Sequence, residues 1–135
     1  MYALDAATGF NLLCLPPLTH EADVATATWA LAATYCQDRR AMLIIDAPAA
    51  WTANAATAIS TAQTGVSGLR TTVGNDDARN AAVYFPRLRM ADPLSENRLA
   101  EFAPCGAVAG IIARTDVQRG IWKAPAGLDA SFSGV

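Results

Sequence analysis

The sequence predicts an α/β fold, with a mainly parallel sheet flanked by helices in a three-layer sandwich. The apolar runs at residues 10–15, 41–45 and 81–85 are short and nearly continuous, which is typical of strands buried on both faces. Segments with apolar residues at helical spacing separate these runs. Strands and helices that alternate with short connections indicate parallel strands joined by right-handed crossovers.

Length and composition are those of one domain, residues 1–135, with 53% apolar residues and a single core. The net charge is −2, from 12 acidic and 10 basic residues, so the chain carries no electrostatic signature of nucleic-acid binding. No apolar run reaches membrane-spanning length, and we expect no stable membrane insertion.

The first strand, residues 10–15, ends at two prolines, and we expect a helix to follow it. Thr19 can cap this helix, and Glu21 and Asp23 would lie in its first turn, where the helix dipole favours acids. An apolar stripe continues toward Arg40, where basic residues suit a helix C-terminus.

The second strand, 41–45, is followed by a helix that continues to Leu69, with Thr52 as its candidate cap. Residues 72–80 are polar and rich in turn-forming types, which predicts a loop before the third strand.

Residues 91–103 are expected to form a second loop. Pro104 then suits the first turn of a third helix, which should end near Gly120. Residues 122–134 show no periodicity, so we expect an α/β domain that is incomplete at its C-terminus.

No constellation for catalysis, cofactor binding or metal binding emerges from the residues. His20 is the one imidazole, and neither a G-x-S-x-G elbow nor a glycine-rich phosphate loop is present. Cys14, Cys36 and Cys105 form no CxxC pair and are expected to be free thiols of a reducing cytoplasm. Asp46 follows a central strand and is interpreted as a turn-forming residue.

Two stretches of sequence are more specific. One is Tyr84–Pro93, which reads YFPRLRMADP, and the other is Cys105–Gly127, which contains CGAVAGIIARTD and RGIWKAPAG. Together they resemble the tail sheath proteins of contractile phages and related particles. Cys105 and Thr115 depart from the small polar residue and the acid expected at these places.

The resemblance implies a non-enzymatic structural protein without cofactors, the middle α/β domain of a longer sheath subunit. Such subunits assemble in the bacterial cytoplasm around a tail tube, on a baseplate, and contract to drive the tube through a cell envelope. Their terminal arms add strands to the sheets of neighbouring subunits. By itself this domain is expected to be a monomer or a weak oligomer.

The resemblance also indicates candidate structural or intersubunit contacts. Cations and acids of the two stretches could pair within the domain or between subunits, and Trp122 is expected to pack over the core. The candidates are Arg87, Asp92, Arg114, Asp116, Arg119, Trp122 and Lys123.

Two alternatives remain open from the sequence. The chain could be a stand-alone interaction domain related to sheath proteins. Less expected is a small α/β hydrolase or nucleotide-binding fragment, which would need a pocket around Asp46 or His20.

Overall fold

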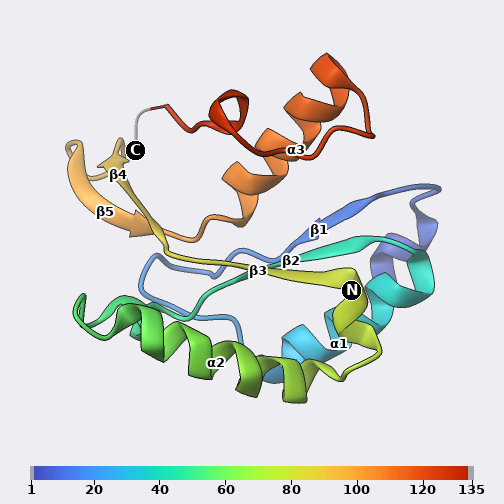
Figure 1. Ribbon diagram of the computed structural model, residues 1–135, viewed down its shortest axis with the longest axis horizontal. Coiled ribbons are helices and arrows are strands. Elements are labelled where there is room, and N and C mark those ends of the chain that lie inside the picture. Colours follow the sequence, from blue (N-terminus) through green and yellow to red (C-terminus); the bar gives the residue numbers. More distant parts are fainter. Residues whose placement is uncertain (1, 134–135) are drawn as a thin grey trace.

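The computed structural model describes residues 2–133 and combines α-helices with two small sheets (Figure 1). The helices are α1 (Thr26–Arg39), α2 (Ala58–Val73) and α3 (Cys105–Arg119). A parallel sheet has the order β1-β2-β3, from Leu12–Cys14, Met42–Asp46 and Ala81–Tyr84. An antiparallel hairpin is formed by β4 (Leu88–Asp92) and β5 (Arg98–Phe102). Short 3-10 helices occupy Tyr2–Ala6, Ala49–Thr52, Asp77–Asn80 and Leu128–Ala130. The predicted α/β class and parallel strands are confirmed.

The central strand β2 is buried on both faces, as its apolar sequence predicts. Leu43 and Ile45 pack with the cluster that includes α1 and α2, whereas Ile44 packs with Val108 of α3. Figure 1 shows α1 and α2 on one side of the parallel sheet and α3 on the other. Burial of each such side chain stabilises the fold by about 1.5–3 kcal/mol. β2 therefore contributes to the packing on both faces of the sheet.

The start of α1 differs from the prediction. The helix begins at Thr26, not at Thr19, and residues 19–22 form a turn instead. The backbone carbonyls of His20 and Ala22 accept hydrogen bonds from the side chain of Arg87. Because those carbonyls accept hydrogen bonds from a distant residue, residues 20–25 do not form the predicted first turns of the helix.

The start of α2 is also later than predicted. Thr52 ends a 3-10 helix, and α2 begins at Ala58. Within the 3-10 helix Trp51 is buried, and its indole lies against Gly65 of α2, where any Cβ would collide with the ring. The irregular segment thus places a large side chain between the sheet and α2.

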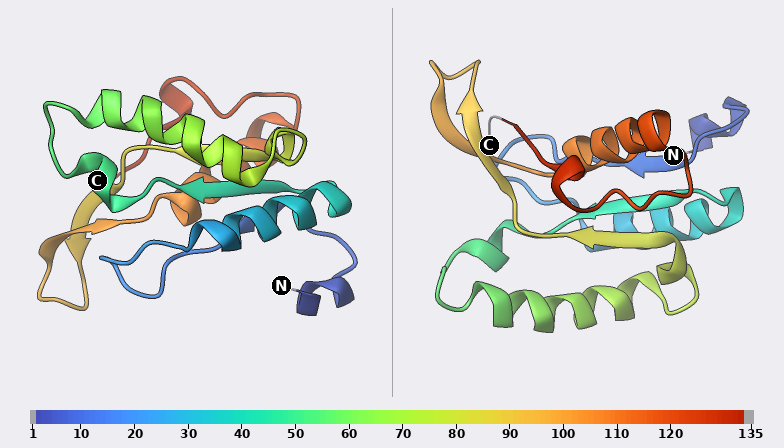
Figure 2. Two further views of the ribbon diagram at one scale, coloured as in Figure 1. Left: turned by 90° about the horizontal axis from the view of Figure 1, so that it is seen from below. Right: turned by 45° about the horizontal axis from the view of Figure 1, so that its top comes forward.

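The expected loop at 91–103 is wrong, because β4 and β5 pair across a turn at residues 93–97. Glu96 and Asn97 have positive φ angles of 55° and 58° in this turn. The hairpin projects beyond the parallel sheet (Figure 2). Its strands are short and carry charged residues, so neither has the apolar pattern of a buried strand.

The limits of α3 agree with the prediction. Pro104 directly precedes the helix, and Gly120 ends it with φ of 92°. A glycine is suited to this left-handed position because a Cβ is strained there. Beyond Gly120 the chain is irregular except for the 3-10 turn at Leu128–Ala130, and it runs back along α3 (Figure 1).

Candidate functional site

The side chain of Arg87 is buried, with 7% of the residue's surface exposed, and it bonds to several segments of the domain. It follows the cis peptide bond of Phe85–Pro86. Its guanidinium donates to the carbonyls of Ala47 at 3.3 Å, His20 at 2.8 Å and Ala22 at 3.1 Å, and it pairs with Asp23. Within residues 2–133 the acid partner of Arg87 is therefore Asp23, and not Asp92 or Asp116.

Asp92 is buried at the base of the hairpin turn. Its carboxylate accepts the N–H of Leu94 at 2.9 Å, and its carbonyl accepts the N–H groups of Ser95 and Asn97. Hydrogen bonds from the Leu94 backbone and the Ser95 side chain lower the pKa of Asp92. Asp92 thus fixes the turn of the hairpin, which is a structural role.

The basic side chains of α3 contact the segment after Gly120, which runs back along the helix. Arg114 donates to the carbonyls of Asp129 at 3.0 Å and Ser131 at 3.1 Å. Arg119 lies 3.7 Å from the carboxylate of Asp129. These contacts hold the returning segment against α3. Among the described residues the side chain of Asp116 forms no ion pair, so the acid of this region is Asp129.

A polar pocket of about 390 Å³ lies between the end of α3 and the returning segment. Arg114, Arg119 and Lys123 line it together with one carboxylate, that of Asp129. Three of the candidate contact residues are thereby brought together. Arg87 lies elsewhere, directly before β4 at the open end of the hairpin, and Asp92 lies at the turn of the hairpin.

Trp122 does not pack over the core, contrary to the prediction, because 85% of its surface is exposed. The positive φ of Gly120 turns the chain away from the end of α3. The indole then lies against the backbone of Gly120, where a Cβ would collide with it. Ile121 and Leu128 are also exposed, so this end of the molecule carries an apolar surface.

Asp46 lies at the end of β2 beside the N-terminus of α3. It is 5% exposed, and its Oδ1 accepts the N–H of Cys105 at 2.7 Å. Its Oδ2 has no hydrogen-bond partner among the described residues, and burial raises the pKa of this carboxyl. Asp46, which is distant from α3 in the sequence, thus caps the N-terminus of this helix.

The thiols near Asp46 are not arranged as nucleophiles. The Cys14 thiol donates to the carbonyl of Cys105 at 3.4 Å. Burial and the neighbouring Asp46 raise the pKa of Cys105, whereas a reactive cysteine has a lowered pKa. His20 lies with Nδ1 4.0 Å from Asp92 and its ring against Phe102, and no serine or cysteine within residues 2–133 hydrogen-bonds to its imidazole.

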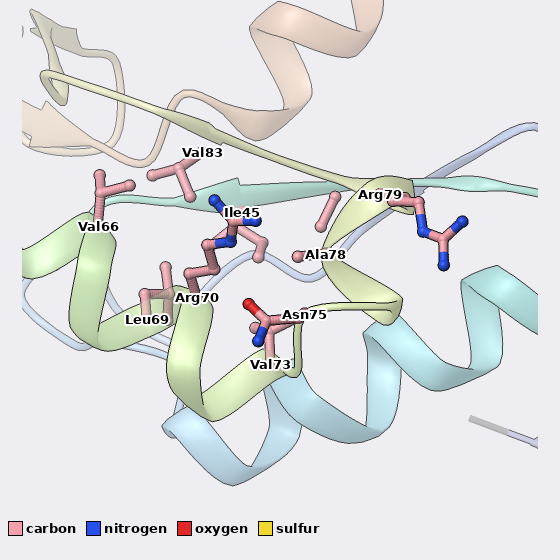
Figure 3. Close-up of a pocket in the computed structure, with 10 residues that line it drawn as sticks. Ile45, Val66, Leu69, Arg70, Val73, Asn75, Ala78, Arg79 and Val83 are labelled. Carbon is pink, nitrogen blue, oxygen red and sulfur yellow. The ribbon is translucent and has the colours of Figure 1, made fainter.

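An apolar groove of about 460 Å³ runs between α2 and β3 (Figure 3). Its walls include Ile45, Leu69 and Val83, and the side chain of Arg70 reaches across it from α2 toward Ile45, as Figure 3 shows. β3 is one of the two edge strands of the parallel sheet, and within residues 2–133 it pairs with β2 alone. One side of β3 is therefore open along the groove.

Within residues 2–133 no group of three or more His, Cys, Asp or Glu side chains is placed to hold a metal ion. No helix in the same range combines the length and apolar character needed to cross a membrane. Comparisons of the chain with protein-family models, with curated proteins and with solved structures found no match.

Two functional candidates were missed by reasoning from the sequence. Asp23 reads as a first-turn acid of a helix, and nothing in its spacing indicates a partner as distant as Arg87. Asp129 lies in a segment without periodicity, and its pairing with Arg119 depends on the return of the chain along α3. Both contacts are non-local and have no signal in the sequence.

Proposed function

We propose that this chain is an α/β domain of the sheath subunit of a contractile tail, a structural protein without catalytic activity. The observation that carries the proposal is the exposure of the segment Arg119–Gly127. This segment is the most specific part of the resemblance to sheath proteins, yet Trp122 and Ile121 in it are exposed. Large apolar side chains at a surface favour a contact with another molecule.

The buried part of the domain suits a subunit that moves as a rigid body. Arg87 links the end of the sheet to Asp23, and Asp92 fixes the hairpin turn. Contraction of a sheath requires subunits that keep their fold while they exchange interface contacts. Buried polar contacts of this kind support such a role. The helices on both faces of the parallel sheet suit a three-layer sandwich.

The open edge of β3 supports association with neighbouring subunits. An extended arm could add beside β3 by main-chain hydrogen bonds and insert apolar side chains into the groove lined by Leu69 and Val83. The proposed partners are thus neighbouring sheath subunits, with the tail tube and baseplate in the assembled particle. Assembly would take place in the bacterial cytoplasm.

A stand-alone interaction domain of sheath ancestry is the second candidate. The same exposed residues at the end of α3, Ile121 and Trp122, favour it, because a contact surface serves either role. The two candidates differ in genetic context and not in chemistry.

Sequencing of the source locus tests the proposal. We expect an open reading frame that continues past residue 135, beside genes for a tail tube and a baseplate. A stop codon at that point, with no tail genes nearby, would contradict the sheath assignment and favour the stand-alone domain. This test does not depend on the behaviour of the isolated chain.

A further inference from the structure

The end of α3 carries a pocket with an excess of positive charge. Three cations, Arg114, Arg119 and Lys123, face the single carboxylate of Asp129. The pair of Arg119 and Asp129 is exposed, and such pairs contribute about 0–1 kcal/mol. Lys123 forms no ion pair among residues 2–133. The pocket is therefore suited to accept a further carboxylate.

Exposed apolar side chains adjoin this pocket. Leu128 lines it, and Ile121 and Trp122 lie in the chain that leads into it. We call this surface the basic end, defined by its charged and apolar members, Arg114, Arg119, Lys123, Ile121, Trp122 and Leu128. A partner that matches the basic end has an acidic and an apolar side chain close together.

The turn of the hairpin, residues 93–97, has this combination. Leu94 is 94% exposed, and Glu96 is exposed two positions later. The carboxylate and carbonyl of Asp92 bind the N–H groups of the turn, so the backbone is ordered before any contact forms. An ordered loop loses less conformational entropy on binding. We call these five residues the hairpin tip.

The hairpin tip lies far from the C-terminal end of α3 and from Trp122 and Lys123, which follow directly after that end. In Figure 1 the hairpin of β4 and β5 is at the left, whereas the C-terminal end of α3 is at the upper right. The right-hand view of Figure 2 shows the same separation. The hairpin tip therefore does not reach Trp122 and Lys123 within one chain, but it can reach them in a second copy.

We propose that the hairpin tip of one copy docks on the basic end of the next. Glu96 exchanges its exposed pairing with Arg98, at 3.1 Å, for the cations at Lys123 and Arg119. Leu94 covers the apolar surface at Trp122. The identity of the partner as a second copy rests on the proposed function, whereas the complementarity of the two surfaces does not.

A contact between two different surfaces of the same chain repeats without closing unless the rotation forms a ring. A helical sheath is built from such head-to-tail contacts. With one small contact for each pair, the isolated chain is expected to form weak, short oligomers whose size rises with concentration and falls with salt.

Charge reversal tests this contact by sedimentation velocity over a range of protein concentrations. Glu96→Lys and Lys123→Glu should each weaken self-association at least about tenfold, because like charges then meet at the contact. An equimolar mixture of the two variants should restore association, since each chain then finds a complementary partner. Asp38→Lys, on the exposed surface of α1, changes charge as Glu96→Lys does and should leave association unchanged.

The contact is overturned by any of three results: no concentration-dependent association of the unaltered chain, single variants that associate normally, or a mixture that fails to restore association. Circular dichroism of each variant distinguishes a lost contact from a lost fold. Tail genes at the source locus together with a failed charge reversal would retain the sheath proposal and reject this interface. The opposite pair of results would retain the interface and reject the sheath.

Discussion

The two stretches that resemble sheath proteins differ in where the structure puts their distinctive side chains. In the stretch from Tyr84 to Pro93, Arg87 is buried and donates four hydrogen bonds within the domain. In the stretch that ends at Gly127, Trp122 is largely exposed and Lys123 faces a pocket. A specific sequence signal can therefore reflect the fold at one place and a surface at another.

Because one stretch is buried and the other exposed, substitutions in the two stretches should change different measured properties. Changes around Arg87 should be detected as a loss of stability, because buried polar groups lose their partners. Changes around Trp122 should leave stability unchanged and alter association. The following predictions test this contrast, in order of decreasing effect on stability.

Arg87→Met should have the largest effect. It leaves the carbonyls of His20 and Ala22 and the carboxylate of Asp23 without their donor, and we expect a loss of about 3 kcal/mol in the free energy of unfolding. Urea denaturation measures this loss. Arg89→Met, at an exposed position on β4, is the matched control and should change stability by no more than about 0.5 kcal/mol. Equal effects at the two positions would contradict the role of Arg87 as a buried donor.

Asp46→Asn should have a smaller effect that depends on pH. Burial raises the pKa of Asp46 in the folded state, so the folded protein binds this proton more tightly than the unfolded chain does. The stability that the proton contributes is complete below the ordinary pKa of aspartate and is lost as pH rises through the raised pKa. The amide keeps the acceptor for Cys105 and does not ionise.

The advantage of the Asp46→Asn variant should therefore grow as pH rises. Urea denaturation of both proteins at about pH 3 and about pH 7 measures it, with the larger gain expected near pH 7. Asp38→Asn, on the exposed surface of α1, is the control. A gain that is largest at the acidic pH would show that the folded state favours the ionised carboxylate.

Trp122→Ala should have the smallest effect on stability, within about 0.5 kcal/mol, because its indole buries little surface in the chain. Trp29→Ala, in the core on α1, should cost about 3–5 kcal/mol in the same denaturation experiment. A loss at Trp122 similar to that at Trp29 would restore the original expectation that Trp122 stabilises the domain.

The elements predicted well are those whose signals are local. β2 is apolar on both faces because helices cover both, and α3 begins after Pro104 and ends at Gly120 for reasons of backbone geometry. The start of α1 could not be predicted, since it depends on Arg87, which is distant in the sequence.

The hairpin and the exposed surface at the end of α3 also could not be predicted from local sequence signals. Among the residues that the structure describes, β4 and β5 pair only with each other, so their sequences lack the pattern of a buried strand. The types of residue at the end of α3 could be predicted as contacts. The exposure of Trp122 could not, because it depends on the direction that the chain takes after Gly120.

The position of Trp122 gives the molecule an intrinsic optical reporter. Trp29 and Trp51 are buried, so an aqueous quencher such as iodide reaches the indole of Trp122 in preference to theirs. The quenched part of the fluorescence therefore comes from the end of α3. Any molecule that covers this surface will protect that part of the emission and shift it to shorter wavelength. Docking can thus be followed on the unlabelled chain.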